Sequence, residues 1–317
     1  MIPVDLITGF LGSGKTTFIK KYASYLMRRG LRIGILENDY GAVNVDMMML
    51  GELQGENCGL EMVAGACDAD CHSRRFKTKM IALGMSGYDR VLIEPSGIFD
   101  VDEFFDVLHE SPLDRWYEPG SVITVIDSGL ESELSDSGAY LLASQAAVAG
   151  KVVLSKAQLA TPEEMNNTLL RLNSALEQVG CPRRFTMDEV ITKDWNSLTD
   201  DDFDALSRCG YRSERFVKRF GSDDVPFTTL YFMNLSIDKQ GLLTVIDLLM
   251  HSEKCGKVFR VKGFVRQDGG WLEVNATRSD TAMQPVDNGQ DIIIVIGENL
   301  NEENIRAAVH RKEGETA

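Results

Sequence analysis

Short apolar runs alternate along the first part of the chain with longer stretches in which apolar residues recur at helical spacing. The apolar runs predict strands at residues 2–7, 32–36, 90–93, 121–126 and 151–154. The helical patterns occupy residues 16–29, 73–85, 100–110, 131–148, 161–179 and 202–208. Strands and helices that alternate in this way predict βαβ units and a mostly parallel sheet with helices on both faces. The stretch 37–46 and the Gly-, Cys- and Asp-rich stretch 51–72 predict loops.

One helix start carries a local signature. Thr161 is followed by Pro162 at the first helical position and by Glu164 three residues after the cap. This arrangement is typical of a capping box, in which Thr and Glu side chains satisfy each other's backbone N–H groups.

The pattern changes near residue 210, and the charged stretch 213–225 predicts a connection. Beyond it, strand patterns lie at 226–234, 258–266, 271–277 and 291–297, with helical patterns at 237–250 and 301–310. Short loops such as 267–270 predict hairpins, and therefore an antiparallel sheet with helices on one face. We expect an α/β domain over residues 1–212 and a smaller α+β domain over residues 226–317.

Composition narrows the class of protein. With 317 residues, 44% hydrophobic and 26% charged, the chain is typical of a soluble protein of two domains. A net charge of −15 argues against binding to nucleic acid or to an anionic membrane surface. No apolar run approaches the roughly 18 residues of a membrane span, and no export signal is visible. The six cysteines are therefore expected to be reduced, and the predicted location is cytoplasmic.

The first seventeen residues contain a phosphate-binding loop. Gly9 to Thr17 reads G-x-x-x-x-G-K-T-T between a predicted strand and a predicted helix. Glycines let successive backbone N–H groups surround phosphate oxygens, and the helix directs its positive dipole end at them. Lys15 is expected to reach the β- and γ-phosphates, and Thr16 to ligate Mg²⁺. The predicted nucleotide contacts are Gly9, Gly12, Ser13, Gly14, Lys15, Thr16 and Thr17. The first domain is thus predicted to be a P-loop NTPase.

Two further segments fit a P-loop enzyme. A strand ends at Glu94-Pro95-Ser96-Gly97, where Glu94 is expected to hold the Mg²⁺ shell and Gly97 to approach the γ-phosphate. The loop 37–46 is a candidate switch, in which Asp39 or Glu37 orients the attacking water. The alternatives are a surface glutamate before a proline turn and a solvated acidic loop.

Potential metal ligands crowd between these segments. The sequence at 67–72 contains Cys67, Cys71 and His72, with two aspartates between the cysteines. Two thiolates and an imidazole suit a borderline-soft ion such as Zn²⁺. Cys58 lies upstream and is a further candidate. The alternative is a pair of buried small residues with two aspartates at a helix start.

The order of these motifs resembles the CobW-type GTPases, relatives of the UreG and HypB metallochaperones. The matching segments are residues 9–17, 37–41, the cysteine loop, 94–97, 152–156 and 259–264. The resemblance implies a GTP-hydrolysing protein that binds a transition metal, Zn²⁺ or Co²⁺, as cargo. It also implies delivery to a client metalloprotein or a corrinoid-pathway protein. On this resemblance the cargo ligands are Cys67 and Cys71, with Glu37 and His72 as additional candidates.

The chain departs from the family pattern at three places. Cys-x-Cys-Cys is replaced by Cys67 and Cys71 separated by Asp-Ala-Asp, and Asn-Glu-Phe-Gly becomes Asn-Asp-Tyr-Gly at residues 38–41. The guanine-reading Asn-Lys-x-Asp becomes Ser155-Lys156-Ala157-Gln158. A neutral Gln158 cannot replace a charge-assisted pair of hydrogen bonds, a loss of roughly 1.5–3 kcal/mol. Ser155, Lys156 and Gln158 remain predicted base contacts, with GTP or ATP both open.

Two hypotheses follow from the sequence. The first is a Mg²⁺-dependent P-loop nucleoside triphosphatase coupled to metal delivery, with Lys15, Asp39 and Glu94 as its catalytic residues. The second is a nucleotide-dependent interaction switch with little catalysis and a structural cysteine loop. Both are compatible with a homo-oligomer, since the sequence leaves the oligomeric state open.

Overall fold

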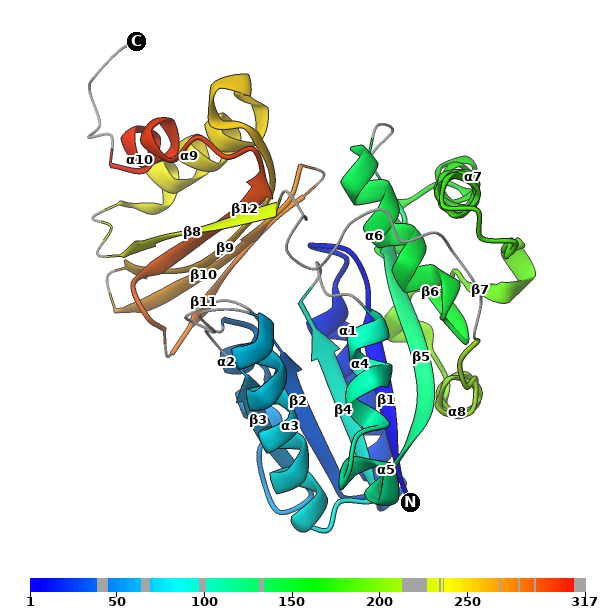
Figure 1. Cartoon of the computed structure of the whole chain (residues 1–317). Coiled ribbons are helices and arrows are strands. Elements are labelled where there is room, and N and C mark those ends of the chain that lie inside the picture. The colour runs from blue at the N-terminus through cyan, green and yellow to red at the C-terminus, as the bar shows by residue number, and fades with distance from the viewer. Residues whose placement is uncertain are drawn as a thin grey trace. The chain divides into compact units, whose positions relative to one another are not determined.

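The computed structural model of the chain contains two compact units, Met1–Val225 and Pro226–Ala317 (Figure 1). It describes residues 1–38, 45–63, 69–96, 101–130, 134–212, 227–233, 235, 237–267, 269–278, 280–287 and 289–310. At 45, 46, 69, 70, 102 and 103 it describes the backbone alone. The predicted connection at 213–225 lies outside the described residues.

The first unit is built on a seven-stranded sheet with the order β3-β2-β4-β1-β5-β6-β7. Its strands are β1 (Ile2–Thr8), β2 (Ile33–Asn38), β3 (Cys58–Val63), β4 (Arg90–Pro95), β5 (Tyr117–Asp127), β6 (Lys151–Ser155) and β7 (Val190–Ile191). Every neighbouring pair in this order is parallel. All these strands therefore end at the same edge of the sheet, and the predicted parallel α/β class is confirmed.

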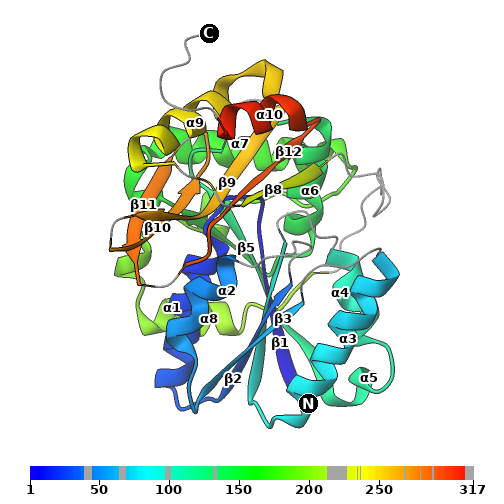
Figure 2. The ribbon, with the colours of Figure 1, turned by 90° about the vertical axis from the view of Figure 1, so that its left-hand side faces the viewer.

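Helices cover both faces of this sheet (Figure 2). They are α1 (Lys15–Arg28), α2 (Val45–Leu50), α3 (Ala69–Met85), α4 (Val101–Leu108), α5 (Leu113–Trp116), α6 (Asp136–Ala147), α7 (Pro162–Gln178) and α8 (Asp200–Ser207). One core layer joins α1 and α8 to the sheet. A second core layer joins α3, α4 and α5 to the opposite face. α6 is buried along nearly its whole length and packs against α7.

The stretch 51–72 was expected to be a loop, and this expectation is wrong. It contains β3 and the start of α3, and residues 45–50 before it form α2. β3 is held by parallel pairing with β2 along its length, a long-range interaction that local composition does not reveal. Its Gly59 is required because a Cβ there would lie 1.8 Å from the Tyr88 hydroxyl. The short strand β7 was also missed.

The second unit is an antiparallel five-stranded sheet with the order β11-β10-β9-β12-β8. Its elements are β8 (Phe227–Met233), α9 (Lys239–His251), β9 (Lys257–Gln267), β10 (Gly270–Ala276), β11 (Thr281–Val286), β12 (Ile292–Glu298) and α10 (Glu302–Val309). The predicted hairpin is present, since Gln267 pairs with Gly270. The half-exposed strand β11 was not predicted.

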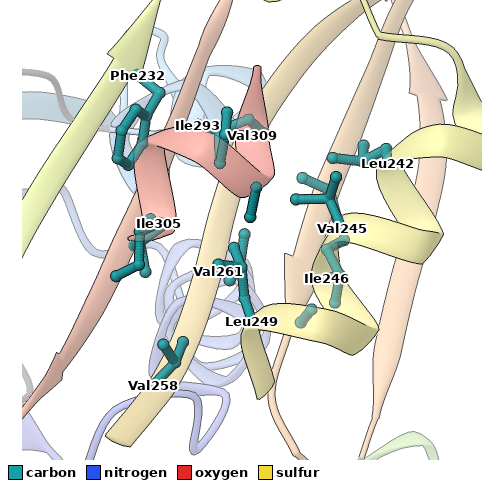
Figure 3. Close-up of a cluster of buried hydrophobic side chains, with 14 of the residues drawn as sticks. Phe232, Leu242, Val245, Ile246, Leu249, Val258, Val261, Ile293, Ile305 and Val309 are labelled. Carbon is teal, nitrogen blue, oxygen red and sulfur yellow. The ribbon is translucent and has the colours of Figure 1, made fainter. Parts of the chain in front are cut away.

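The core of the second unit lies between its helices and its sheet. Figure 3 shows Leu242, Val245, Ile246 and Leu249 of α9 directed toward Val261 of β9. The second unit is thus the small α+β domain that the sequence predicts. Among the described residues of the chain, no helix is long and apolar enough to cross a membrane.

Candidate nucleotide site

Buried polar side chains gather at the edge where the parallel strands of the first unit end. They belong to the ends of β1, β2, β4 and β6 and to the loop that leads into α1. Those buried to more than nine-tenths are Thr8, Ser13, Lys15, Thr16, Glu37, Asn38, Glu94 and Ser155. Ligands of open parallel sheets bind outside this edge, so the burial of polar groups here marks a site.

The loop between β1 and α1 depends on its glycines. Gly9, Gly12 and Gly14 have φ angles of 151°, 75° and 91°, a region that favours glycine. A Cβ on Gly9 would lie 2.2 Å from the Val125 carbonyl oxygen of β5. Gly14 is the N-cap of α1, and none of the described side chains caps that turn, which leaves its first N–H groups suited to an anion. Thr17, in the first turn of α1, is exposed.

Lys15 and Thr16 open α1 and are both buried. The Lys15 ammonium donates to the Gly9 carbonyl at 3.1 Å, which folds it over the loop that would hold phosphates. The Thr16 hydroxyl donates to Glu94 Oε1 of β4 at 2.9 Å. A hydroxyl and a carboxylate in contact at this point form the all-oxygen donor set that Mg²⁺ prefers. These residues therefore fit the ion that a P-loop requires.

A second carboxylate lies beside Glu94. Glu37 of β2 is its register partner in the parallel pair, and both are 2% exposed. Ile35 and Leu92, two positions earlier, belong to the core beneath α1. Because side chains alternate along a strand, Glu37 and Glu94 point to the same face as Thr16. Two carboxylates, instead of one, are therefore buried beneath the P-loop as potential oxygen ligands.

Several polar groups at this edge are not satisfied by the protein. Among the described residues, none forms a hydrogen bond with the buried side-chain oxygens of Thr8, Ser13 and Ser155 or with the Asn38 amide group. Leaving a buried polar group without a partner costs about 1–3 kcal/mol. Their clustering around the P-loop fits a polar ligand better than a packing role.

The predicted base-reading segment lies at the end of β6. Lys156 has a left-handed φ of 54°, and its ammonium pairs with Asp127 Oδ2 of β5 at 2.9 Å. The other oxygen of Asp127 accepts from the Gly129 N–H at 2.9 Å. Gln158 is exposed. No role was predicted for Asp127, although its position at the end of a strand could have indicated one.

Trp195 is another residue that the sequence analysis missed. It follows β7, and its indole Cη2 lies 3.3 Å from where a Cβ on Gly14 would stand. The indole N–H donates to the Leu154 carbonyl at 2.9 Å, and the ring packs edge-on against Phe18 at 5.4 Å. Trp195 therefore links the P-loop to β6, the strand that leads into the predicted base-reading segment. No sequence motif indicates this role of Trp195, because its contacts with Gly14 and Leu154 join segments that are distant in the chain.

The predicted cargo-metal residues are only partly described. Cys71 and His72 lie in the first turn of α3, where His72 is fully buried and Cys71 is half-buried. Cys67, Asp39 and Gly97 lie outside the described residues. Within the described ranges, no group of three or more His, Cys, Asp or Glu residues is arranged to hold a metal ion. The cargo site thus stays a prediction.

Cys58, the further candidate, lies far along the sheet from Glu37. It pairs with Ile33 at the beginning of β3, whereas Glu37 pairs with Met62 near the end of the strand. Four strand residues at about 3.3 Å each place Cys58 roughly 13 Å away along the sheet. Burial also raises the pKa of the Cys58 thiol to about 11, which disfavours the thiolate that binds metals.

This fold and this edge define a P-loop protein of the nucleoside triphosphatase class. Known families support that assignment. The model of the "CobW/HypB/UreG, nucleotide-binding domain" matches residues 3–179, and that of the "Cobalamin synthesis protein cobW C-terminal domain" matches residues 233–312. The chain belongs to the CobW/HypB/UreG family, which confirms the resemblance seen in its motifs.

Individual relatives are more distant. The zinc chaperone YjiA of Escherichia coli is 28% identical over 184 residues, which cover 55% of this chain and 55% of YjiA. The zinc chaperone YeiR of Escherichia coli is 27% identical over 164 residues, covering 51% and 49% of the two chains. The chain thus aligns with about half the length of these relatives. A crystal structure of Zn(II)-bound YjiA GTPase covers 98% of this chain and 99% of its own, at 18% identity and a TM-score of 0.35.

Proposed function

We propose that this protein is a Mg²⁺-dependent P-loop nucleoside triphosphatase that handles a transition-metal cargo. The observation that carries the proposal is the buried contact between Thr16 and Glu94 beneath the P-loop. This contact joins the helix that follows the loop to the strand that ends beside it. Family membership supports nucleotide binding at the same place.

The residues of the P-loop would divide the work of phosphoryl transfer. The Gly9–Gly14 amides and the N-terminus of α1 would hold the phosphates, and Lys15 would leave the Gly9 carbonyl to neutralise developing charge. Thr16 and Glu94 would hold Mg²⁺, which supplies charge neutralisation at the β- and γ-phosphate oxygens. We assign the orientation of the attacking water to Asp39 or Glu37.

The base is proposed to be guanine, recognised with weak preference. A relative in Schizosaccharomyces pombe is named a zinc-regulated GTPase, which supports guanine, but Gln158 offers no carboxylate to the guanine edge. Asp127 contacts Lys156 and Gly129, and we assign it to positioning Lys156 rather than to reading the base. ATP is therefore expected to compete measurably with GTP at this site.

The cargo is proposed to be Zn²⁺. Relatives named as zinc chaperones support this choice. Glu37 is beside Glu94 on the sheet, and Cys71 and His72 begin the helix that follows β3. If Glu37 also binds the cargo, a change at the Mg²⁺ ligands on hydrolysis would reach the cargo through it, because Glu37 is the register partner of Glu94. The ion would pass to a client metalloprotein in the reducing cytoplasm.

The nucleotide part is tested by phosphate release from GTP and ATP over a Mg²⁺ titration. Glu94→Gln and Thr16→Ala are expected to lower turnover about ten- to a hundredfold and to raise the Mg²⁺ concentration at half-maximal rate. Thr78→Ala, on the exposed face of α3, is the matched control and should behave as wild type. Nucleotide binding without turnover in the wild type would favour the interaction switch instead.

The cargo part is tested by equilibrium dialysis with Zn²⁺. The variant Cys67→Ser with Cys71→Ser is expected to lose stoichiometric Zn²⁺, whereas Cys58→Ser should retain it. Zn²⁺ is also expected to change the rate of hydrolysis in the wild type. Equal zinc retention by both variants, with hydrolysis indifferent to Zn²⁺, would show that the cysteine loop carries no cargo.

A further inference from the structure

A cavity of about 290 Å³ lies beside α1, between that helix and the chain that follows β7. Trp195 and Phe203 give it aromatic walls. Phe203 stacks with Tyr25 at 5.2 Å, and Trp195 packs edge-on against Phe18 at 5.4 Å, so these walls belong to a rigid aromatic cluster. Small-molecule sites run from about 300 Å³ upward, and this cavity suits a ligand at the lower end.

The helix side of the cavity is cationic. It is lined by Lys20, Lys21 and Arg28 of α1, and none of the described lining residues is acidic. Two of these cations pair with carboxylates outside the lining, so Lys21 supplies the positive charge that no described acidic residue offsets. The charge of the cavity therefore favours an anion.

The three cations differ in their partners. Lys20 pairs with Glu52 at 2.8 Å and Arg28 with Asp200 at 3.0 Å, and both carboxylates are largely exposed. The Lys21 ammonium instead donates to the neutral Asn196 Oδ1 at 2.9 Å. Exposed ion pairs contribute little, so Lys20 and Arg28 can turn to a ligand at low cost. Lys21 is the cation best placed to receive a charge.

The cavity is connected to the P-loop through one side chain. Trp195 lines the cavity and also abuts Gly14, the N-cap of α1. Its N–H is tied to the Leu154 carbonyl, next to Ser155 at the predicted base-reading segment. A ligand against this ring would contact the same side chain that braces the nucleotide loop.

We propose that this cavity binds a small organic anion with a flat apolar body, and that its occupancy alters nucleotide binding through Trp195. Lys21 receives the charge, and the ring of the ligand lies against the indole. The proposed anion binding is argued from the cavity alone. Its effect on nucleotide binding rests on the function proposed above. Such a ligand would make the nucleotide cycle responsive to a small metabolite.

Binding is tested by calorimetric titration of the full chain with 1-naphthoate in the absence of nucleotide. We expect one saturable site, with the neutral 1-naphthalenemethanol binding at least about tenfold more weakly. Lys21→Gln should weaken naphthoate binding about tenfold. Lys239→Gln, which changes an exposed residue of α9, should leave that binding unchanged. Thermal unfolding of each variant verifies that it is folded. No saturable heat, equal affinity for the neutral probe, or equal binding by the two variants would overturn the site.

Coupling is tested by repeating the titration with saturating Mg²⁺ and GDP. The Kd of naphthoate is expected to shift, and GDP affinity should shift by the same factor when naphthoate is present. An unchanged Kd would overturn the coupling. Failure of GDP to bind at all would count against the nucleotide function and leave the first titration to decide the site.

Discussion

Two clusters of buried polar groups lie beneath the same helix, α1, and differ in how they are satisfied. At the start of the helix, Thr16 meets Glu94. Farther along, the Tyr22 hydroxyl donates to Asp5 Oδ2 at 2.7 Å, and Arg90 Nε lies 3.0 Å from that oxygen. Arg90 and Glu94 belong to one strand and are about 13 Å apart at roughly 3.3 Å per residue.

Both oxygens of Asp5 have partners within the protein, although Arg90 Nε lies near Oδ2 without forming a hydrogen bond. The second oxygen of Asp5 accepts from the Ser121 N–H at 2.8 Å, and Arg90 donates to the Ser207 carbonyl at 2.8 Å. Burial raises the pKa of the Asp5 carboxyl, and the Arg90 guanidinium opposes that shift. A buried charge whose partners are all protein groups belongs to the core. Around the P-loop, by contrast, several buried polar groups have no hydrogen-bond partner among the described residues, which fits a polar ligand.

The largest effect is expected from breaking the Asp5 cluster. Arg90→Leu leaves the Asp5 carboxylate buried without its cation, which typically costs about 3–5 kcal/mol. Urea unfolding measures this loss, and nucleotide affinity per folded molecule should be unchanged. The double variant Asp5→Asn with Arg90→Leu should recover most of the loss, because no charge then remains buried. A double variant as unstable as the single one would exclude the ion pair as the cause.

At the P-loop we expect the opposite outcome: activity is lost and stability is nearly unchanged. Lys15→Ala should lower nucleotide hydrolysis about 10²- to 10³-fold, because it removes a cation that stabilises transition-state charge. Loss of the hydrogen bond from the Lys15 ammonium to the Gly9 carbonyl should lower the free energy of unfolding by about 1 kcal/mol, the usual contribution of a single hydrogen bond. Lys79→Ala, which removes an exposed ion pair with Glu61, is the control for both measurements. A large loss of stability would make Lys15 part of the core.

A substitution in the predicted base-reading segment, residues 155–158, is expected to increase the preference for GTP. Gln158→Asp restores a carboxylate and should raise the preference for GTP over ATP about ten- to a hundredfold. Gln158→Asn is the matched control, because it has the same size as Asp without the charge. Dissociation constants for both nucleotides in Mg²⁺ give the ratio. An unchanged ratio for the Asp variant would show that this loop does not read the base.

The smallest effect is expected from a capping carboxylate at the start of a helix. Hydrogen bonds from Lys193 and Thr199 lower the pKa of Asp202 at the start of α8 from its usual 3.8. A lowered pKa means that this stabilisation is present above about pH 4 and is lost as the pH falls further. Asp202→Asn should therefore flatten the acid side of the stability curve slightly. A curve identical to wild type would mean that Asp202 contributes nothing through ionisation.

Features that depend on neighbours in the chain were predictable. The capping box at Thr161 and Glu164 is present as expected, and so is the strand–loop–helix unit around the P-loop. Glu94 was placed at a strand end from its local pattern alone. The strand β3 was missed because Gly59 and its neighbours carry no strand signal of their own. Its stability comes from pairing with β2 and from packing against Tyr88.

The sequence by itself thus determined the two-domain order, the phosphate loop and the residue types at the ends of the strands. Tertiary structure alone decided which of those residues meet. Strand register set Glu37 beside Glu94, and it moved Cys58 to the far end of the sheet from them. Helix packing brought Trp195 against Gly14. Local patterns arise from contacts within a few residues, whereas a site is assembled by register and packing between segments that the chain keeps far apart.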